Sequence, residues 1–384
     1  MRSRDGGIAG LIFFLVFTTL ILFDGSFPRI GSTADIYDTD HHRVRVVTIV
    51  PELENPWGVA FLPDGRMLVT ERAGRLRYVD GRGNVSKPLA GVPEVFARGQ
   101  GGLLDVALDP DFSDNRLVYL SYAEPGKGGG GTAAGRGRLK ENRLEDFKVI
   151  FRQLPKANTK VHFGSRLVFS RDGKLFITIG ERGQRERAQD FSIHRGQVIR
   201  IMPDGSVPED NPFAGRQGYR PETWSHGHRN PQGAALHPAT GRLWTVEHGA
   251  RGGDEINIPQ KGRNYGWPVI SYGRHYSGLK IGVGTHKEGM EQPVYYWDPS
   301  IAPSGMTFYT GDRFPAWKGN LLVGALKGQM LVRLELADEK VVNEERMLLG
   351  LKERIRDVRQ GPDGLIYLLT DNSNGRILRL EPIN

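Results

Sequence analysis

The sequence predicts an all-β protein, a six-bladed β-propeller built from four-stranded antiparallel sheets. Three observations support this prediction. A hairpin-like unit recurs along the chain, long amphipathic helical patterns are absent, and no change in composition divides the 384 residues into separate domains. A β-sandwich or a string of small β domains is the alternative, because an apolar run followed by a turn occurs in any all-β protein.

Each unit consists of an apolar run, a tight turn usually built on Pro-Asp or Asp-Gly, and a second apolar run. β-branched and aromatic residues on both sides of such a turn are typical of two paired antiparallel strands. Successive units begin roughly 45 to 75 residues apart, which suits a four-stranded sheet with its loops, and radial repetition of such sheets gives a propeller. The six copies span residues 58–71, 105–122, 166–181, 233–249, 305–326 and 357–371.

Residues 1–34 predict a signal peptide or an N-terminal anchor, and residues 35–384 the propeller. Arg2 and Arg4 precede an apolar stretch at 8–23, as in export signals. That stretch is short for a membrane-spanning helix, which needs about 20 residues. We therefore expect a periplasmic or otherwise exported protein with no stable membrane insertion after signal removal. The chain has no cysteine, so packing must stabilise it without disulfides.

The net charge of +8 raises the question of an anionic partner. Lysine and arginine are scattered along the chain without a run of five, and an export signal argues against intracellular DNA, so nucleic acid is not expected. A small polyanionic ligand held by a few convergent arginine and lysine side chains fits better.

Ligands of a propeller bind in the loops at one end of its axis, so segments that interrupt the repeat are candidate sites. Gln100 stands before two glycines, which permit close approach of a ligand to the backbone, although a plain tight turn would explain them as well. His162 directly precedes a predicted strand, where it could act as a base near neutral pH or serve only in structure.

The segment 222–233 places His226, His228 and Arg229 close together. Two histidines without a third ligand at the usual spacing are weak evidence for zinc. Arg229 is the better candidate, because a guanidinium suits a carboxylate or a developing oxyanion, with a surface ion pair as the alternative.

Two further segments carry charge. The glycine-rich acidic loop 247–268 could offer carboxylate and carbonyl oxygens to calcium, or could be an ordinary solvated loop. Arg354 and Arg356 are two residues apart on a predicted strand, so both should project from one face, where they need an anion or solvent. The glycine-rich stretch 126–139 is either a flexible loop near the mouth or slack between strands.

These segments together resemble the soluble pyrroloquinoline quinone (PQQ)-dependent aldose sugar dehydrogenases of the glucose/sorbosone dehydrogenase family. The resemblance covers about residues 47 to 382, essentially the whole mature chain. Its most specific blocks, in chain order, are GQGGLLDVALDPDF, HFGSRLVFSRDGKLFITIGERG, SHGHRNPQGAALHP, EHGARGGDEINIPQKGRNYGWP, SIAPSGMTFYTGDRFPAWKGNLLVGALKG and RIRDVRQGPDG.

The resemblance implies roles for individual residues. His162 matches the general base that removes the proton of the anomeric hydroxyl, and Arg229 matches a catalytic cation. The positions that match quinone-holding residues or their motif neighbours are Gln100, Arg229, Asn230, Tyr276, Ala325, Leu326, Lys327, Arg354, Ile355 and Arg356. Calcium is implied at the carbonyls of Gly249 and Ala250 and at the pair Glu255 and Tyr265. Many relatives carry proline where Ala250 stands, so the fixed φ of proline is lost there.

The implied reaction oxidises an aldose at its anomeric carbon to the lactone, with hydride transfer to PQQ and electrons passed on to an external acceptor. Calcium would polarise the quinone. The rival interpretation is a calcium-dependent propeller lactonase, which would need several carboxylates and amides around one ion. The sequence identifies neither the preferred sugar nor the oligomeric state.

Overall fold

The structure is a computed structural model that describes residues 35–383, and its fold is a six-bladed β-propeller. The predicted signal peptide or anchor at 1–34 lies outside the described residues. Among the described residues, no helix is long and apolar enough to cross a membrane.

Six antiparallel sheets follow one another along the chain. The first contains β3 (Pro56–Phe61), β4 (Met67–Glu71) and β5 (Arg75–Val79). The second contains β6 (Leu103–Leu108), β7 (Leu117–Gly126), β8 (Gly129–Lys140) and β9 (Arg143–Arg152). The third contains β10 (Gly164–Phe169), β11 (Leu175–Ile179), β12 (Gln197–Ile201) and β13 (Thr223–His226).

The fourth sheet contains β14 (Pro231–Leu236), β15 (Leu243–Glu247), β16 (Asp254–Asn257) and β17 (Tyr295–Trp297). The fifth contains β18 (Pro303–Phe308), β19 (Leu321–Ala325), β20 (Met330–Ala337) and β21 (Lys340–Met347). The sixth contains β22 (Ile355–Gln360), β23 (Ile366–Thr370), β24 (Gly375–Ile383), β2 (Arg43–Leu53) and β1 (Asp35–Asp38). Helical turns are short: α1 (Phe112–Asn115), η1 (Arg185–Gln189), η2 (Pro315–Trp317) and η3 (Leu349–Leu351).

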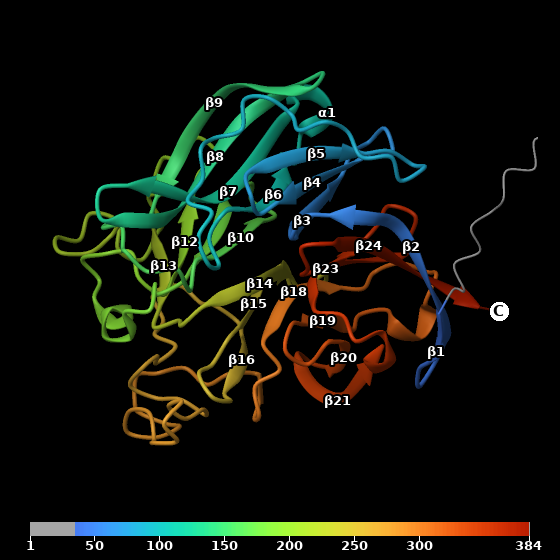
Figure 1. The fold of residues 1–384 in the computed structure, drawn as a ribbon. Coiled ribbons are helices and arrows are strands. Elements are labelled where there is room, and N and C mark those ends of the chain that lie inside the picture. Colours follow the sequence, from blue (N-terminus) through green and yellow to red (C-terminus); the bar gives the residue numbers. More distant parts are fainter. Residues whose placement is uncertain (1–34, 384) are drawn as a thin grey trace, which may run out of the picture. The chain divides into compact units, whose positions relative to one another are not determined.

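The first strands of the sheets line the axis. β3 contacts β6, and the contacts continue through β10, β14, β18 and β22 back to β3, which closes the ring. In Figure 1 the labelled inner strands gather near the centre, whereas β9, β13, β16 and β21 lie at the periphery. Each predicted hairpin coincides with the first two strands of one sheet. The predicted six-fold repeat is therefore confirmed.

The sixth sheet has five strands and the first sheet has three. The sixth sheet closes the ring, because it combines strands from both ends of the described chain. β2 pairs antiparallel with β24, with Val44 opposite Pro382, and β1 adds an outer edge to that sheet. The first sheet keeps three strands, because after β5 the chain forms only an isolated bridge between Val79 and Val85. The segment that follows contains Pro88 and Pro93, which cannot donate to a strand ladder.

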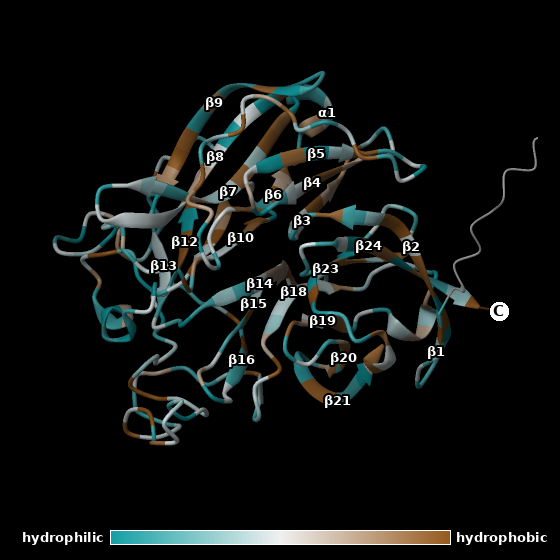
Figure 2. Cartoon of the chain, viewed as in Figure 1, coloured by the Kyte–Doolittle hydropathy of each residue, from teal (hydrophilic) through white to brown (hydrophobic). Residues whose placement is uncertain are grey.

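The hydrophobic core lies between adjacent sheets. The second strands β4, β11, β15, β19 and β23 are buried along their whole length. Hydrophobic colouring in Figure 2 accordingly falls mainly on strands, and hydrophilic colouring on many of the turns. The stretch 126–139 belongs to this framework, since β7 and β8 stay paired out to Gly126 opposite Gly129. This stretch is therefore part of two paired strands, and neither a flexible loop nor an unpaired connection between strands.

A buried ion network crosses the axis between three sheets. Arg166 of β10 donates to Asp105 of β6 at 2.9 Å and lies 3.1 Å from Asp357 of β22, while Arg359 pairs with both carboxylates at 2.9 Å. Asp105 and Asp357 are fully buried. Removing one member would leave a buried charge with fewer partners, which is strongly destabilising, so the network fixes how these sheets face one another.

All six sheets share an irregularity at the same end. The pairing between first and second strands shifts register at the start of the first strand in every sheet. Hydroxyl groups satisfy the backbone there. Thr178 accepts the Arg166 N–H at 2.9 Å and donates to the Pro231 carbonyl of the next sheet at 2.9 Å. Bulges of this kind redirect side chains and are frequent beside active sites.

Candidate active site

The bulged end of the ring carries a cavity of about 490 Å³. Seven residues predicted from the sequence line it: Gln100, His162, Arg229, Gly249, Ala250, Tyr276 and Lys327. They come from loops that are far apart in the sequence and that meet because the strands they flank surround one axis. The structure therefore brings these seven residues to one cavity, and their chemical roles stay predictions.

A second cavity of about 260 Å³ adjoins the first and shares Gln100, His248 and Ala302 with it. The predicted residues Leu326, Arg354 and Arg356 line this second space. The sequence prediction missed its other walls, which are Trp57, Arg72, Gln232 and Asp371, as well as His248 between the two cavities.

His162 has the geometry of a base. Its Nδ1 atom is hydrogen-bonded to Glu181, which is separated from the end of β11 by one glycine. Its Nε2 atom has no hydrogen-bond partner among residues 35–383. A carboxylate that accepts the Nδ1 proton leaves the Nε2 lone pair free to take a proton. Burial, opposed by Glu181 and reinforced by Arg229, lowers the pKa of His162. The ring is therefore neutral and competent as a base at neutral pH.

The backbone around His162 is strained and is held in place by polar contacts. His162 has φ of 55°, which is uncommon for a residue other than glycine. Its N–H donates to the Gln100 side-chain carbonyl at 2.7 Å. Gln100 thus orients the loop that carries the base as well as lining the cavity.

Arg182 holds the same loop through hydrogen bonds to its backbone carbonyls. Its guanidinium donates to the carbonyls of Thr159, at 2.7 Å, and Val161, and lies 3.3 Å from the centre of the Phe163 ring. The side chain is fully buried, and burial together with the neighbouring Arg195 lowers the pKa of Arg182 to about 9. Burying a cation costs free energy unless the cation is well hydrogen-bonded. The contacts of Arg182 with the carbonyls before His162 therefore indicate that Arg182 positions the His162 loop.

Arg229 is buried and lines the same cavity as His162. Its N–H donates to Glu247 at 2.6 Å, its Nη1 donates to the His248 carbonyl at 3.1 Å, and its guanidinium lies 5.2 Å from the Trp267 ring. The Nε–H has no hydrogen-bond partner in the described part of the chain. Burial lowers the pKa of Arg229. A guanidinium that lines a cavity and has an unused donor is suited to an anionic oxygen.

The histidines beside Arg229 do not form a zinc site. His228 is hydrogen-bonded through Nδ1 to Glu247 at 2.8 Å and through Nε2 to Ser225 at 2.9 Å, so both ring nitrogens are used. Within residues 35–383 no three His, Cys, Asp or Glu side chains converge on one point. A metal ion at this end would depend on backbone carbonyls as well as side chains.

Arg354 and Arg356 do share a face, as predicted, but a protein carboxylate already lies between them. Asp371, next after β23, accepts from Arg354 at 2.9 Å and from Arg356 at 3.1 Å. Burial opposes ionisation, yet Arg356 and Arg354 lower the pKa of Asp371 to about 2. The anion that the sequence analysis required between these two arginines is thus supplied at least in part by the protein itself. Two guanidiniums still exceed one carboxylate, which leaves a net positive cavity wall.

The donors of the site fit a polyanionic group. Arg229 Nε and Arg356 Nε belong to residues that line the two cavities, and both atoms are buried without hydrogen-bond partners in the part of the chain that the structure describes. Lys327 is exposed at the cavity and makes no ion pair with any described residue. Since buried polar groups are normally hydrogen-bonded, these orphaned donors point to a bound acceptor.

Three predicted cofactor residues do not line either cavity. Asn230 is fully buried, and its side-chain oxygen accepts the Gly164 N–H at 3.1 Å, which ties the Arg229 loop to β10. Ala325 and Ile355 are buried in the hydrophobic core. Their side chains contribute packing next to Leu326, Arg354 and Arg356.

The residues expected to bind calcium lie close together. Gly249, Glu255 and Tyr265 line a void of about 10 Å³ that Glu247 also borders. Burial, reinforced by Glu247, raises the pKa of Glu255 to about 8. Glu247 is buried and Glu255 is half-buried, and Arg229 lines the same void. Carboxylate and carbonyl oxygens around one small void are the ligand types that calcium prefers. The Tyr265 hydroxyl already donates to the Ile258 carbonyl at 2.5 Å and accepts the Gln260 N–H at 2.9 Å, so only its backbone carbonyl could serve as a ligand.

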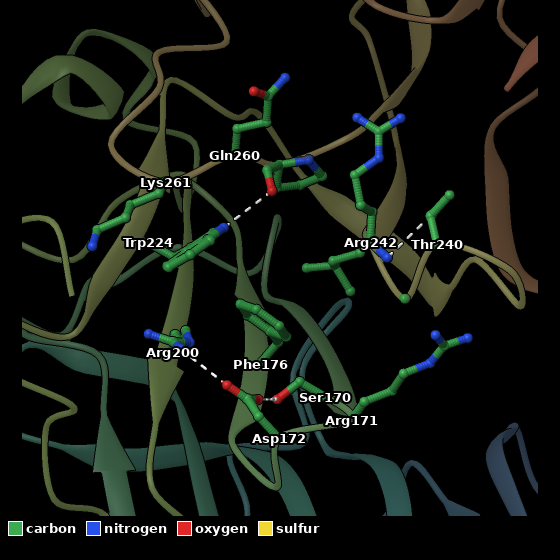
Figure 3. A pocket seen from close by; sticks show the side chains of 13 residues that line it. Ser170, Arg171, Asp172, Phe176, Arg200, Trp224, Thr240, Arg242, Gln260 and Lys261 are labelled. Carbon is green, nitrogen blue, oxygen red and sulfur yellow. Dashed lines mark hydrogen bonds and ion pairs between the residues drawn. The ribbon is translucent and has the colours of Figure 1, made fainter. Parts of the chain in front are cut away.

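A third cavity, of about 430 Å³, lies at the turns on the opposite ends of the β10–β11 and β14–β15 hairpins. Figure 3 shows Trp224 and Phe176 on one side and Arg171 and Arg242 on the other. None of the predicted site residues lines it. Its Arg200 is already paired with Asp210 at 3.0 Å, so we do not assign the active site there.

The fold and the site define a propeller with a carboxylate-paired histidine at a cavity that cationic side chains line. The chain belongs to the glucose/sorbosone dehydrogenase family, whose model, described as "Glucose / Sorbosone dehydrogenase", matches residues 53–379. It is thus an oxidoreductase that acts on CH–OH groups of sugars.

Individual relatives agree with this assignment. The chain is 50% identical over 347 residues to "Aldose sugar dehydrogenase YliI" of Escherichia coli strain K12, covering 89% of this chain and 94% of that protein. The crystal structure of the soluble aldose sugar dehydrogenase from Escherichia coli in the apo-form superposes with a TM-score of 0.87 at 49% identity, over 88% of this chain and 100% of that one. The PQQ-bound aldose sugar dehydrogenase from Streptomyces coelicolor superposes with a TM-score of 0.74 at 31% identity, over 88% and 97% of the two chains.

Proposed function

We propose that the protein oxidises aldose sugars at the anomeric carbon to the lactone, with PQQ as cofactor and calcium as its structural and electrostatic partner. The observation that carries the proposal is the convergence of a neutral, carboxylate-oriented His162 and the buried Arg229 on one cavity lined by further cationic side chains. Export to the periplasm and transfer of electrons to an external acceptor belong to the same proposal.

His162 takes the proton of the anomeric hydroxyl on its Nε2 atom, while Glu181 fixes the ring and stabilises the charge that it gains. Arg229 supplies positive charge to an oxygen that becomes anionic during the reaction. When bound, PQQ would accept the hydride that leaves the anomeric carbon. Arg354, Arg356 and Lys327 would hold its carboxylates.

The calcium ion would lie against the carbonyls of Gly249 and Ala250, with Glu255 and the Tyr265 carbonyl as a further pair. Calcium accepts carbonyl and carboxylate oxygens in flexible numbers, so the alanine at position 250 retains the needed carbonyl. The carboxylates of Glu247 and Glu255, which border one void together with Gly249, support a cation in this wall.

The experiment adds PQQ and calcium to the purified apo-protein and follows reduction of a phenazine-coupled dye with glucose and other aldoses, while NMR identifies the product. We expect dye reduction and lactone formation that both require PQQ. Hydrolysis of added lactone without dye reduction would instead support the calcium-dependent lactonase and overturn the proposal.

The base assignment has its own test. His162→Ala should bind PQQ with unchanged affinity but lose about 10²- to 10⁴-fold in kcat, the usual cost of removing a general base. His41→Ala, at an exposed histidine far along the chain from the site loops, is the matched control and should retain full turnover. Full turnover in the His162 variant would remove His162 from the mechanism.

A further inference from the structure

Large hydrophobic side chains stand exposed on one segment beside the cavity. We call residues 274–287, which follow β16, the mouth loop. Tyr276 is 76% exposed, Leu279 is 70% exposed and Val283 is 60% exposed. Single exposed apolar residues are ordinary on a protein surface, but a group of them on one segment marks an interaction site. Hydrophobic stretches are visible in the loops that follow β16 in Figure 2.

The mouth loop is attached to the wall of the cofactor cavity. Arg251, which lines the cavity, exchanges backbone hydrogen bonds with Arg274 at 2.9 and 3.1 Å. Tyr276 lines the cavity as well. Ile281 is almost fully buried in a small hydrophobic cluster with Trp267. The exposed apolar side chains are therefore held next to the redox site by an anchored segment.

The loop is also basic. Arg274, Lys280 and Lys287 are exposed, and none of them pairs with a carboxylate of residues 35–383. Glu288 is the nearest carboxylate in the sequence, directly after the loop. Unpaired cations around exposed apolar side chains resemble a docking surface whose partner supplies the opposite charge, since complementary charge steers encounter and fixes orientation.

We propose that the mouth loop is the docking surface for a redox protein whose own redox centre is surrounded by acidic residues, and that this protein is the electron acceptor. The inference rests on the proposed function, because an acceptor is needed only if the bound cofactor is reduced. A small-molecule acceptor inside the cavity would not need Leu279 and Val283, which do not line it. An anionic phospholipid surface would fit the charge but is not itself an electron acceptor.

The test compares acceptors on the holoenzyme. Plastocyanin serves as the acidic redox protein, mitochondrial cytochrome c as the basic one, and phenazine methosulfate as the small acceptor. The variant Lys280→Glu/Val283→Ser should lose at least tenfold in kcat/KM with plastocyanin and keep its rate with phenazine methosulfate. The wild-type rate with plastocyanin should fall as salt rises, because salt screens the attraction, and should exceed the rate with cytochrome c at low salt.

A matched control exists on β21, where Lys340 is exposed and Val342 is 59% exposed. Lys340→Glu/Val342→Ser changes the same residue types at similar exposure and should leave all rates unchanged. An equal loss in both variants, no preference for plastocyanin over cytochrome c, or a loss with phenazine methosulfate as well would each overturn the proposal.

A binding measurement separates this proposal from the proposed function. Surface plasmon resonance at low salt should detect plastocyanin on the wild-type protein and not on the Lys280→Glu/Val283→Ser variant, whether or not sugars are oxidised. Absence of sugar-dependent dye reduction in the wild-type protein would refute the proposed function alone. Flotation with phosphatidylglycerol vesicles that depends on Lys280 and Val283, without an effect on plastocyanin, would assign the loop to a membrane and overturn the docking proposal.

Discussion

The pair of His162 and Glu181 is the residue-scale feature on which turnover should depend most. Burial lowers the pKa of His162, and the Glu181 carboxylate acts in the opposite direction. A base works only when it is unprotonated, so activity should be present above the pKa of His162 and lost as the pH falls through it. In a plot of kcat against pH, the midpoint of the decline on the acidic side should therefore lie below the ordinary histidine pKa of about 6.5.

Glu181→Gln removes the charge that raises the pKa of His162, so the acidic limb should move to still lower pH. The maximal kcat should also fall, by about 10²-fold, because the imidazole loses the partner that orients it and stabilises its protonated form. The measurement is kcat against pH from 4 to 9. Glu186→Gln, at an exposed carboxylate that among the described residues pairs only with Arg185, is the control and should reproduce the wild-type profile. An unmoved limb in Glu181→Gln would show that the carboxylate does not set the pKa.

Residue chemistry alone could indicate His162 and Arg229 as candidates, with structural roles as the alternative, but not Glu181 or Asp371. His162 and Arg229 stand in segments that break the repeat, whereas each of these acids ends a hairpin unit and looks like a turn residue in the sequence. A signal was nevertheless present. Glu71, Glu181, Glu247 and Asp371 occupy the same place in four repeats, at or just after the end of the second strand. Each pairs with a cation or histidine of its own sheet or site.

At the scale of elements, the inner hairpins could be predicted because their apolar alternation and turns are local. The outer strands could not be assigned in the same way, since their pairing depends on neighbours distant in sequence. The short β13, β16 and β17 lie between long irregular loops, and β2 joins a sheet formed by the opposite end of the chain. The paired β7–β8 extension was missed because glycine is rare inside strands.

The loop that presents His162 depends on Arg182, which is the element-scale prediction. Arg182→Met removes the donors to the carbonyls of Thr159 and Val161, so the loop should relax from its positive-φ geometry. A displacement of about 1 Å can cost 10²-fold in rate, so we expect kcat to fall about 10- to 100-fold with little change in PQQ affinity. Thermal unfolding of the same samples tests whether the fold is retained.

Arg187→Met is the matched control for Arg182→Met, because Arg187 is exposed and its one ion-pair partner within residues 35–383 is Asp190. It should leave kcat unchanged. A full wild-type kcat in Arg182→Met would show that the loop holds His162 without Arg182. A parallel loss of PQQ binding would instead place Arg182 in cofactor binding.

At the scale of the whole molecule, the ring converts a linear sequence into a site. Residues from Gln100 to Arg356 line two adjoining cavities because six inner strands begin at the same end of one axis. The site therefore requires the ring to be closed. Closure depends on β2, whose Val44, Val46, Val50 and Leu53 are buried in one cluster with Ile377, Leu378 and Leu380 of β24.

Two shortened chains test this dependence. A chain that begins at residue 39 lacks β1, whose residues are largely exposed, and should unfold cooperatively within a few degrees of the chain that begins at residue 35. A chain that begins at residue 55 also lacks β2. Burial of an aliphatic side chain contributes about 1.5–3 kcal/mol, so losing four removes about 6–12 kcal/mol, comparable to the entire stability of about 5–15 kcal/mol of a typical protein. Calorimetry should show no cooperative transition for this shorter chain.

Adding β2 back as a separate peptide tests whether the shorter chain is unstable because its propeller ring is open, rather than because it has lost residues in general. A synthetic peptide of residues 43–53 can pair with the exposed edge of β24 by strand addition, since its partners in the full chain run from Ile383 to Gly375. The peptide should restore a cooperative transition, and with PQQ and calcium some turnover, to the chain that begins at residue 55. If that chain unfolds at the same temperature as the one beginning at residue 39, with or without peptide, the ring is held by contacts between neighbouring sheets and does not need the joined ends.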